Sequence, residues 1–441
     1  MNTAELTSIE KRHVWHPFTQ MRDWEATDPL FIVKGSGVRL FDSNGNGYWD
    51  ANSSLWVNVH GHGRREIDEA IKRQVDELGH STMLGLTHPG AALLAQRLAS
   101  IAPPGLTRVF YSDSGSTAVE IALKMAYQYH CHRGQSERSR FVALEESYHG
   151  DTIGSVSVGG IGLFHGIFRR LLFPVDFAPS PSRFKDAGEA ASKLEAMLSR
   201  GGSEIAAVII EPLVQAAGGM LLSPPGYLNI VRELCTRYGV LMIVDEVATG
   251  FGRTGRMFAC EHEDVTPDLM CVAKGLTGGY LPLAATITTD DVYSAFLGDF
   301  SELKTFFHGH SYTGNPLACA AALASLDIFE NDGVIASLAD KIDYVRARLQ
   351  KIAKLPHVGE IQQCGLMSGI DLVKSTGVPY PFAQAVGAKV CRRARDLGLI
   401  TRPLGNLVIF LPPLVSTIDE IESMLTIIEE AISQVTTDME P

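Results

Sequence analysis

The stretch 240–277, VLMIVDEVATGFGRTGRMFACEHEDVTPDLMCVAKGLT, determines how the rest of the chain is interpreted. Its run 241–244 is apolar with β-branched members, which is typical of a strand covered on both faces. A pair of acids beginning at Asp245 follows directly, and the carboxyl ends of strands are where open α/β sheets bind ligands. A second apolar run, 270–273, ends at Lys274. Two such strands, lying side by side, would direct a carboxylate and an amine into one crevice.

A carboxylate and an amine in one crevice fit the chemistry of pyridoxal 5'-phosphate. Lys274 is the predicted nucleophile that joins this cofactor as a Schiff base, and it needs burial and nearby cations to lower its pKa. Asp245 is predicted to face the pyridine nitrogen, where attraction of roughly 4 kcal/mol at about 4 Å keeps that nitrogen protonated. Taken alone, Lys274 also fits a surface lysine after a strand, and Asp245 fits a helix cap or a solvated strand end. The prediction of a cofactor site therefore depends on the two residues occurring together. We expect the glycine-rich turn 250–255 between them to frame the pocket.

The run SDSGS (112–116) follows another predicted strand and precedes a helical pattern. Ser114, Gly115 and Ser116 are predicted to hold the phosphate, because small residues at a helix N-terminus let the backbone amides approach an anion. Many helix caps have the same composition, so this run is a weak motif by itself. Thr117 with Glu120 predicts a capping box for the helix.

Three further segments contain candidate site residues. Tyr148 could stack on the cofactor ring or bond through its hydroxyl, with a packed loop tyrosine as the alternative. Arg402 is a candidate to bind a substrate carboxylate through two parallel hydrogen bonds, and Arg253 is a weaker candidate for the same role. The segment 308–315, HGHSYTGN, has no acidic or cysteine companions at metal-ligand spacing, which favours further phosphate donors over a metal.

The composition bounds the class of protein. With 441 residues, we expect two subdomains, and the net charge of −12 argues against nucleic acid or an anionic membrane as a partner. Seven scattered cysteines without a C-x-x-C spacing indicate free thiols in a reducing compartment. No apolar run approaches the length of a membrane span, and the N-terminus is polar. The expectation is a cytoplasmic enzyme without metal.

Helical and strand patterns alternate as far as about residue 325, which predicts βαβ units and a mainly parallel sheet. We assign 63–328 to a large cofactor-binding domain, and 1–62 with 329–441 to a smaller α+β domain. An Asn-Gly turn predicts a hairpin at 38–50. Residues 1–35 are expected to be irregular. One alternative is an N-terminal arm that packs on a partner or on the rest of the chain, and the other is a segment that places residues 15–19 at the rim of the site.

The segment LMIVDEVATGFGRTG, followed by PDLMCVAKGLTGGYLPL, resembles the class III pyridoxal phosphate aminotransferases of fold type I. The resemblance extends over essentially the whole chain. The segments HVWHPFTQM, SDSGSTAVEIALKMA, ESYHGDTIGSVSVG and FFHGHSYTGNPLAC are similar to the biotin-pathway branch of that family. The resemblance implies conversion of 8-amino-7-oxononanoate to 7,8-diaminononanoate, in a ping-pong reaction through pyridoxamine phosphate. It implies S-adenosylmethionine as the amino donor, with lysine as the other candidate.

The resemblance also implies roles for individual residues. It gives Lys274, Asp245 and Tyr148 the catalytic and ring-binding roles described above, and it places the substrate carboxylate on Arg402. Cofactor and substrate contacts from Gly309, His310 and Ser311 would come from the neighbouring subunit. An obligate homodimer with shared active sites is therefore expected.

Departures from the family pattern concern the amino donor. Many members that use S-adenosylmethionine have tyrosine where Phe18 stands, and a Trp-Trp pair where this chain has Leu55 and Trp56. Ala248 replaces a glutamine common in class III enzymes, as in the biotin branch. We expect Phe18, Leu55 and Trp56 to contact substrate, and the first two favour lysine. The alternatives are a broad ω-amino acid:pyruvate or diamine transaminase and, more remotely, a non-catalytic protein that binds the cofactor.

Overall fold

A seven-stranded sheet forms the centre of the larger part of the molecule in the computed structural model, which describes residues 3–437. Only β12 runs against the other strands, because it is antiparallel to both of its neighbours. The predicted α/β class and mainly parallel sheet are confirmed. In spatial order the strands are β4 (Leu106–Ser112), β12 (Ala284–Thr289), β11 (Leu269–Val272), β10 (Leu241–Asp245), β7 (Ile205–Ile210), β5 (Arg140–Leu144) and β6 (Asp176–Ala178).

Helices cover both faces of this sheet because its central strands are apolar on both sides. Every residue of β7 and β10 is buried, and neighbours along β10 alternate between two cores, with Ile243 in one and Met242 and Val244 in the other. The first core contains the buried face of α6 (Gly115–His132). The second contains α5 (Pro89–Ile101), α9 (Ala187–Gly201), α10 (Tyr227–Tyr238) and α12 (Pro316–Asn331).

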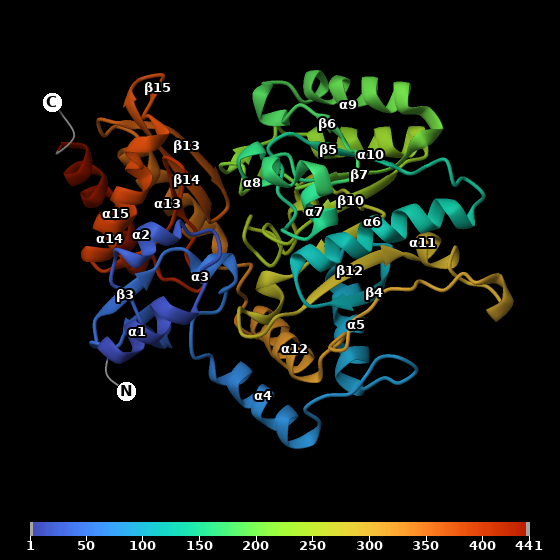
Figure 1. The fold of residues 1–441 in the computed structure, drawn as a ribbon, viewed down its shortest axis with the longest axis horizontal. Coiled ribbons are helices and arrows are strands. Elements are labelled where there is room, and N and C mark those ends of the chain that lie inside the picture. Colours follow the sequence, from blue (N-terminus) through green and yellow to red (C-terminus); the bar gives the residue numbers. More distant parts are fainter. Residues whose placement is uncertain (1–2, 438–441) are drawn as a thin grey trace.

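The N-terminal and C-terminal segments lie together at the other end of the molecule, blue beside orange and red in Figure 1. They share a sheet, since β16 (Leu399–Ile400) pairs in parallel with β3 (Gly47–Asp50), which continues the hairpin with β2 (Arg39–Asp42) and β1 (Ile32–Ser36). A second sheet contains β13 (Val358–Cys364), β14 (Met367–Ser375), β15 (Val378–Pro379), β17 (Pro403–Leu404) and β18 (Leu407–Phe410). Helices α13 (Leu338–Ile352), α14 (Val386–Asp396) and α15 (Ile418–Thr437) pack with them.

Further elements belong to the larger part of the chain. They are α4 (Arg65–Glu77), α7 (Ile153–Ser157), α8 (Gly162–His165), α11 (Asp290–Ser294) and the ribbon of β8 (Val214–Gln215) with β9 (Leu221–Leu222). The one-turn element α3 (Ser53–Trp56) leads from β3 towards the cavity described below. Across residues 3–437, no helix has the length and apolar character that crossing a membrane requires.

The expectation that 1–35 is irregular is wrong for its described residues, 3–35, and residues 1–2 lie outside the described part. This segment contains α1 (Thr3–His13), α2 (Met21–Glu25) and most of β1, whereas the hairpin predicted at 38–50 is confirmed as β2 and β3. Neither helix has a buried residue, so their sequences lack the apolar period that reveals a helix. They are held instead by polar contacts such as Trp24 Nε1, which donates to both carboxylate oxygens of Glu10 at 3.2 Å. Strands β12 and β13 and helix α15 were also not predicted.

Candidate active site

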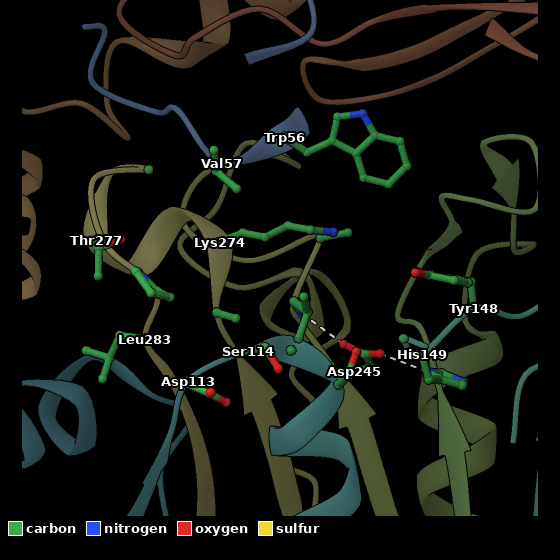
Figure 2. Close-up of a pocket in the computed structure, with 18 of the residues that line it drawn as sticks. Trp56, Val57, Asp113, Ser114, Tyr148, His149, Asp245, Lys274, Thr277 and Leu283 are labelled. Atoms are coloured by element: carbon green, nitrogen blue, oxygen red, sulfur yellow. Dashed lines mark hydrogen bonds and ion pairs between the residues drawn. The ribbon is translucent and has the colours of Figure 1, made fainter. Parts of the chain in front are cut away.

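A cavity of about 380 Å³ opens at the carboxyl ends of β7, β10 and β11, beside the N-terminus of α6 (Figure 2). It combines one lysine, three carboxylates and one histidine with aromatic and small residues. Its lining residues are Trp56, Val57, Asp113, Ser114, Gly115, Ser116, Tyr148, His149, Gly150, Glu211, Ala217, Asp245, Val247, Ala248, Ala273, Lys274, Thr277, Gly279, Tyr280, Leu281, Pro282 and Leu283.

Lys274 reaches this cavity because β10 and β11 are adjacent and parallel, as predicted. Its own backbone is left-handed, with φ of 43°, an uncommon conformation for a residue with a side chain. The amine lies 4.8 Å from the centroid of the Trp56 indole. Burial lowers the pKa of Lys274 to about 8, with Arg253 contributing in the same direction and Asp245 opposing the shift. An amine of this pKa is partly uncharged near neutral pH and therefore nucleophilic.

Asp245 is buried beneath Lys274 and held by two donors. His149 Nδ1 lies 2.7 Å from Asp245 Oδ2, and the Val247 amide donates to Oδ1 at 3.0 Å. Glu246, the second acid of the pair, points elsewhere: Oε2 accepts from the Thr249 hydroxyl at 2.5 Å, and Oε1 accepts from a backbone amide at 2.8 Å. Of the two acids, only Asp245 is available to a ligand in the cavity.

The N-terminus of α6 also borders the cavity and provides open amides there. A Cβ on Gly115 would lie 2.6 Å from Val247 Cγ1, so this position accommodates only glycine without movement. Ser116 Oγ accepts from the Asp151 amide at 3.1 Å and keeps its own proton to donate. An anion can therefore approach the backbone of Gly115 and Ser116 closely.

The predicted capping box at this helix is wrong. The helix begins three residues earlier than expected, because Ser114 rather than Thr117 is the N-cap, and Thr117 is the third residue of the helix. The Thr117 amide donates to Ser114 Oγ at 3.3 Å, and the Ser114 amide donates back to Thr117 Oγ1 at 3.0 Å. Glu120 instead accepts the Gly154 amide at 2.6 Å, which ties α6 to α7.

The arrangement fits pyridoxal phosphate by its geometry. A carboxylate fixed by two donors, an amine of lowered pKa and a glycine-lined helix N-terminus border one space (Figure 2). Asp245 would face the ring nitrogen, Lys274 the reactive carbon, and Gly115 with Ser116 the phosphate.

Tyr148 lies at the side of the cavity, half-buried, with its hydroxyl donating to Asp151 Oδ2 at 2.8 Å. Burial and this hydrogen bond raise the pKa of Tyr148, so its hydroxyl remains protonated at physiological pH. Its ring is nearly parallel to that of His165, with 6.1 Å between centroids and 11° between planes. Asp151 therefore holds the side chain at its hydroxyl and His165 holds it along its ring, so that Tyr148 forms a fixed wall of the cavity.

His149 and Glu211 are two ionisable cavity residues that the sequence did not predict as site residues. Glu211 accepts from the amides of Tyr148 and Ala216, each at 3.0 Å. Burial raises the pKa of Glu211 to about 7, and the nearby Asp245 adds to the shift. A signal for Glu211 existed, since it ends a strand adjacent to the one ending at Asp245. Nothing local marks His149, which depends on a contact with a residue 96 positions away.

The predicted substrate residues at the N-terminal end separate into two groups. Trp56 lines the cavity, whereas Leu55 and Phe18 do not and are 47% and 59% exposed. Phe18 packs edge-on against Phe164, with centroids 5.6 Å apart, and Phe164 in turn packs edge-on against Tyr148 at 6.2 Å. Phe18 is therefore linked to the cavity wall through one intervening ring.

The two candidate arginines have different environments. Arg402 is half-buried, close enough to Tyr148 for the two side chains to interact electrostatically, and burial lowers its pKa. Arg253 is completely buried and donates to the carbonyls of Trp56, Asn58 and Pro412 at 3.3, 2.9 and 2.8 Å. The hypothesis that Arg253 binds a carboxylate is wrong for this arrangement, because those contacts occupy its guanidinium.

The glycine-rich turn also has a different role from the one expected. A Cβ on Gly252 would meet side chains of Leu414, Ile335 and Leu338, so the turn packs on the C-terminal part rather than framing the cavity. Residues 309–311 do not line the cavity of their own chain. Within residues 3–437, no group of three or more His, Cys, Asp or Glu side chains is arranged to hold a metal ion.

Comparisons with known proteins agree with this geometry. Residues 21–432 match the family described as Aminotransferase class-III. The adenosylmethionine-8-amino-7-oxononanoate aminotransferase of Geobacter sulfurreducens is 51% identical, over 99% of this chain and 99% of its own length. The crystal structure of the Methanocaldococcus jannaschii protein of that name has a TM-score of 0.96 at 45% identity, covering 98% of this chain and 99% of its own. The omega transaminase of Pseudomonas jessenii in complex with PMP has a TM-score of 0.93 at 30% identity, covering 98% of each chain.

Proposed function

The chain belongs to the class-III aminotransferase family, and from that premise we propose that it transfers an amino group to 8-amino-7-oxononanoate in biotin biosynthesis, giving 7,8-diaminononanoate. The observation that carries the proposal is the meeting of Lys274 and Asp245 in one cavity, in a chain similar along its full length to proteins named for this reaction. The proposed donor is S-adenosylmethionine, with lysine as the second candidate.

Pyridoxal 5'-phosphate is the cofactor of this family, and when bound it supplies the electron sink that amino transfer requires. Asp245, oriented by His149, favours a proton on the ring nitrogen. Lys274 Nζ moves a proton to and from the substrate carbon that bears the transferred nitrogen, a task suited to a pKa of about 8. Gly115 and Ser116 hold the phosphate, and Tyr148 limits the space beside the ring.

The substrate end of the site is proposed to use Arg402 and Trp56. Arg402 does not line the cavity itself but is close enough to Tyr148 to interact with it electrostatically, and its guanidinium can form paired hydrogen bonds with the terminal carboxylate of a long oxo acid. Trp56 provides an apolar wall above the amine for the aliphatic chain. Phe18, through Phe164, would complete the outer rim.

The test is an assay of the purified, cofactor-loaded enzyme with the oxo acid and each donor separately. We expect formation of the diamino acid with S-adenosylmethionine or with lysine. Borohydride treatment should attach the cofactor to the Lys274 peptide in the wild type and not in Lys274→Ala, as measured by mass spectrometry. Absence of product with both donors contradicts the substrate, and absence of the labelled peptide contradicts the cofactor chemistry.

A second candidate function is favoured by the fold similarity to omega transaminases, with a TM-score of 0.94 at 30% identity for one engineered variant. The same purified protein would then use β-alanine or a simple diamine as donor with pyruvate as acceptor. Turnover of those pairs that exceeds turnover of the oxo acid would favour this candidate over the first.

A cytoplasmic homodimer with shared active sites is also proposed. Large apolar side chains are exposed on two loops, with Leu84 at 84%, Leu86 at 60%, Phe307 at 76% and Tyr312 at 64% exposure, and such surfaces mark interfaces. Residues 309–311 belong to the second loop. Mixing an inactive Lys274→Ala chain with a chain altered at 309–311 should restore activity in hybrid dimers, whereas no restoration contradicts shared sites.

The domain division at 63–328 remains a proposal. The pairing of β3 with β16 supports a small domain built from both ends of the chain. Limited proteolysis should cut first in the connections next to these boundaries, before Arg65 and after Asn331 where α12 ends, and cuts inside the seven-stranded sheet would contradict the division.

A further inference from the structure

The turn that precedes the cavity is left-handed at four consecutive residues, none of them glycine. From Ser53 to Trp56 the φ angles are 46°, 49°, 86° and 69°. Left-handed backbone is unfavourable for every L residue with a Cβ, and it persists only where the surroundings impose it. The last residue of the turn is the one whose ring lies over Lys274.

Buried polar contacts hold the backbone of this turn. Asp50 accepts from the Ser54 amide through Oδ1 at 2.9 Å and from the Ser54 hydroxyl through Oδ2 at 2.8 Å. Ser53 Oγ donates to the Leu411 carbonyl at 2.7 Å, which anchors the turn to the C-terminal part. These bonds determine where the turn lies, but none of them contacts the indole ring.

A different bond orients the indole. Trp56 Nε1 donates to Asn52 Oδ1 at 3.1 Å, and both residues are buried. Rotation about the side-chain torsions would swing the ring away from Lys274 while leaving the turn unchanged, so this hydrogen bond selects the rotamer seen here. Breaking it would leave a buried indole N–H without a partner.

We propose that Asn52 is a positioning residue that acts through Trp56, fixing the indole as the wall above the Lys274 amine against which an amine substrate is placed. The contact has an electrostatic consequence, because an ammonium group is attracted to the face of an indole. The tethered ring therefore stabilises the charged form of Lys274 and partly offsets the effect of burial.

The first test measures the free Lys274 amine in the full-length chain after removal of the cofactor, and it needs no substrate. The pH dependence of its labelling by acetic anhydride, followed on the Lys274 peptide, gives the midpoint of its titration. In Asn52→Leu, which keeps the volume and removes the acceptor, we expect the midpoint to fall by about half a pH unit. An unchanged midpoint overturns the proposal. If Asn52→Leu does not fold, Asn52→Ala is measured in the same way.

The second test asks whether Asn52 acts through the indole N–H. Trp56→Phe keeps a ring and removes the donor, so the effect of Asn52→Leu should disappear in that background. Ser53→Ala is the matched control, because it loses one buried hydrogen bond from the same turn and none from the indole. We expect Ser53→Ala to lower Tm without moving the midpoint. An equal shift in Ser53→Ala, or an undiminished one in the Trp56→Phe background, overturns the proposal.

The kinetic part of the inference rests on the proposed function. In the cofactor-loaded enzyme, Asn52→Leu should lower kcat/KM for the amino donor about threefold to tenfold, and less in the Trp56→Phe background. A wild type inactive with both donors would count against the proposed function, while the labelling midpoints would still decide the role of Asn52. An unchanged kcat/KM in an active enzyme overturns the positioning role.

Discussion

His149 Nδ1 and Asp245 Oδ2 lie 2.7 Å apart, and both side chains are almost inaccessible to solvent. The histidine comes from the segment after β5 and the aspartate from the end of β10, so the contact joins two parts of the cavity floor. A carboxylate held in this way cannot rotate, and it presents a fixed charge to the ring nitrogen. The orientation of Asp245 thus depends on a residue from a different strand end.

Replacement of His149 should therefore weaken cofactor binding strongly only when the new side chain has no hydrogen-bond donor for Asp245. An asparagine side chain at this position would place an amide N–H where Nδ1 now lies, and so His149→Asn should stay within a few-fold of the wild type. His149→Ala should raise the Kd for pyridoxal phosphate about 10- to 100-fold, the range for a hydrogen bond to a charged group. Absorbance titration of the cofactor-free protein measures this, and equal affinities for both variants would contradict it.

Gly115→Ala should also weaken cofactor binding, for a steric reason. The new Cβ would lie 2.6 Å from Val247 Cγ1, which forces the N-terminus of α6 away from the cavity. Overpacking of this kind costs about 1–3 kcal/mol, so Kd should rise at least about fivefold. Gly79→Ala is the control, because its Cβ meets nothing within 4 Å. Matching affinities in the two variants would show that the close contact is unimportant.

Glu211 should make stability depend on pH in the cofactor-free protein. Its folded pKa of about 7 lies above the ordinary value of 4.5, so its contribution is fully present below about pH 4.5 and is lost as the pH rises through 7. Relative to Glu211→Gln, the wild type should lose on the order of 3 kcal/mol of unfolding free energy over that window. Urea denaturation measures the difference, and the exposed Glu189→Gln should parallel the wild type. A Glu211→Gln curve parallel to the wild type would show that Glu211 titrates normally.

Arg402→Met should raise KM for the oxo acid and leave its methyl ester nearly unaffected. The guanidinium would lose hydrogen bonds to a carboxylate, which are worth about 1.5–3 kcal/mol, or about 10- to 100-fold in KM. Steady-state kinetics with both acceptors distinguishes a lost carboxylate contact from a general disturbance. Arg392→Met, on the exposed face of α14, should behave as the wild type, and an equal effect on acid and ester would contradict the assignment.

Much of the site was predictable because its signals are local. An apolar run that ends in Asp245, another that ends in Lys274 and a small-residue run before α6 each reveal a strand end or a helix start. Parallel strands bring such ends to one edge, so the meeting of these residues followed from the pattern. The antiparallel β12 and the two N-terminal helices were missed, since their neighbours rather than their own periodicity stabilise them.

The sequence by itself determined the fold class, the cofactor chemistry and the pairing of Asp245 with Lys274. The reason is that a short apolar run followed by a polar residue is enough to mark the end of a strand. Only the tertiary structure decided that Glu246 turns away, that Arg253 is occupied by backbone carbonyls and that Asn52 orients Trp56. Each of these outcomes depends on how buried polar groups find partners. The packing of the whole chain determines which partner each group has, since an unpaired polar group is costly once water is excluded.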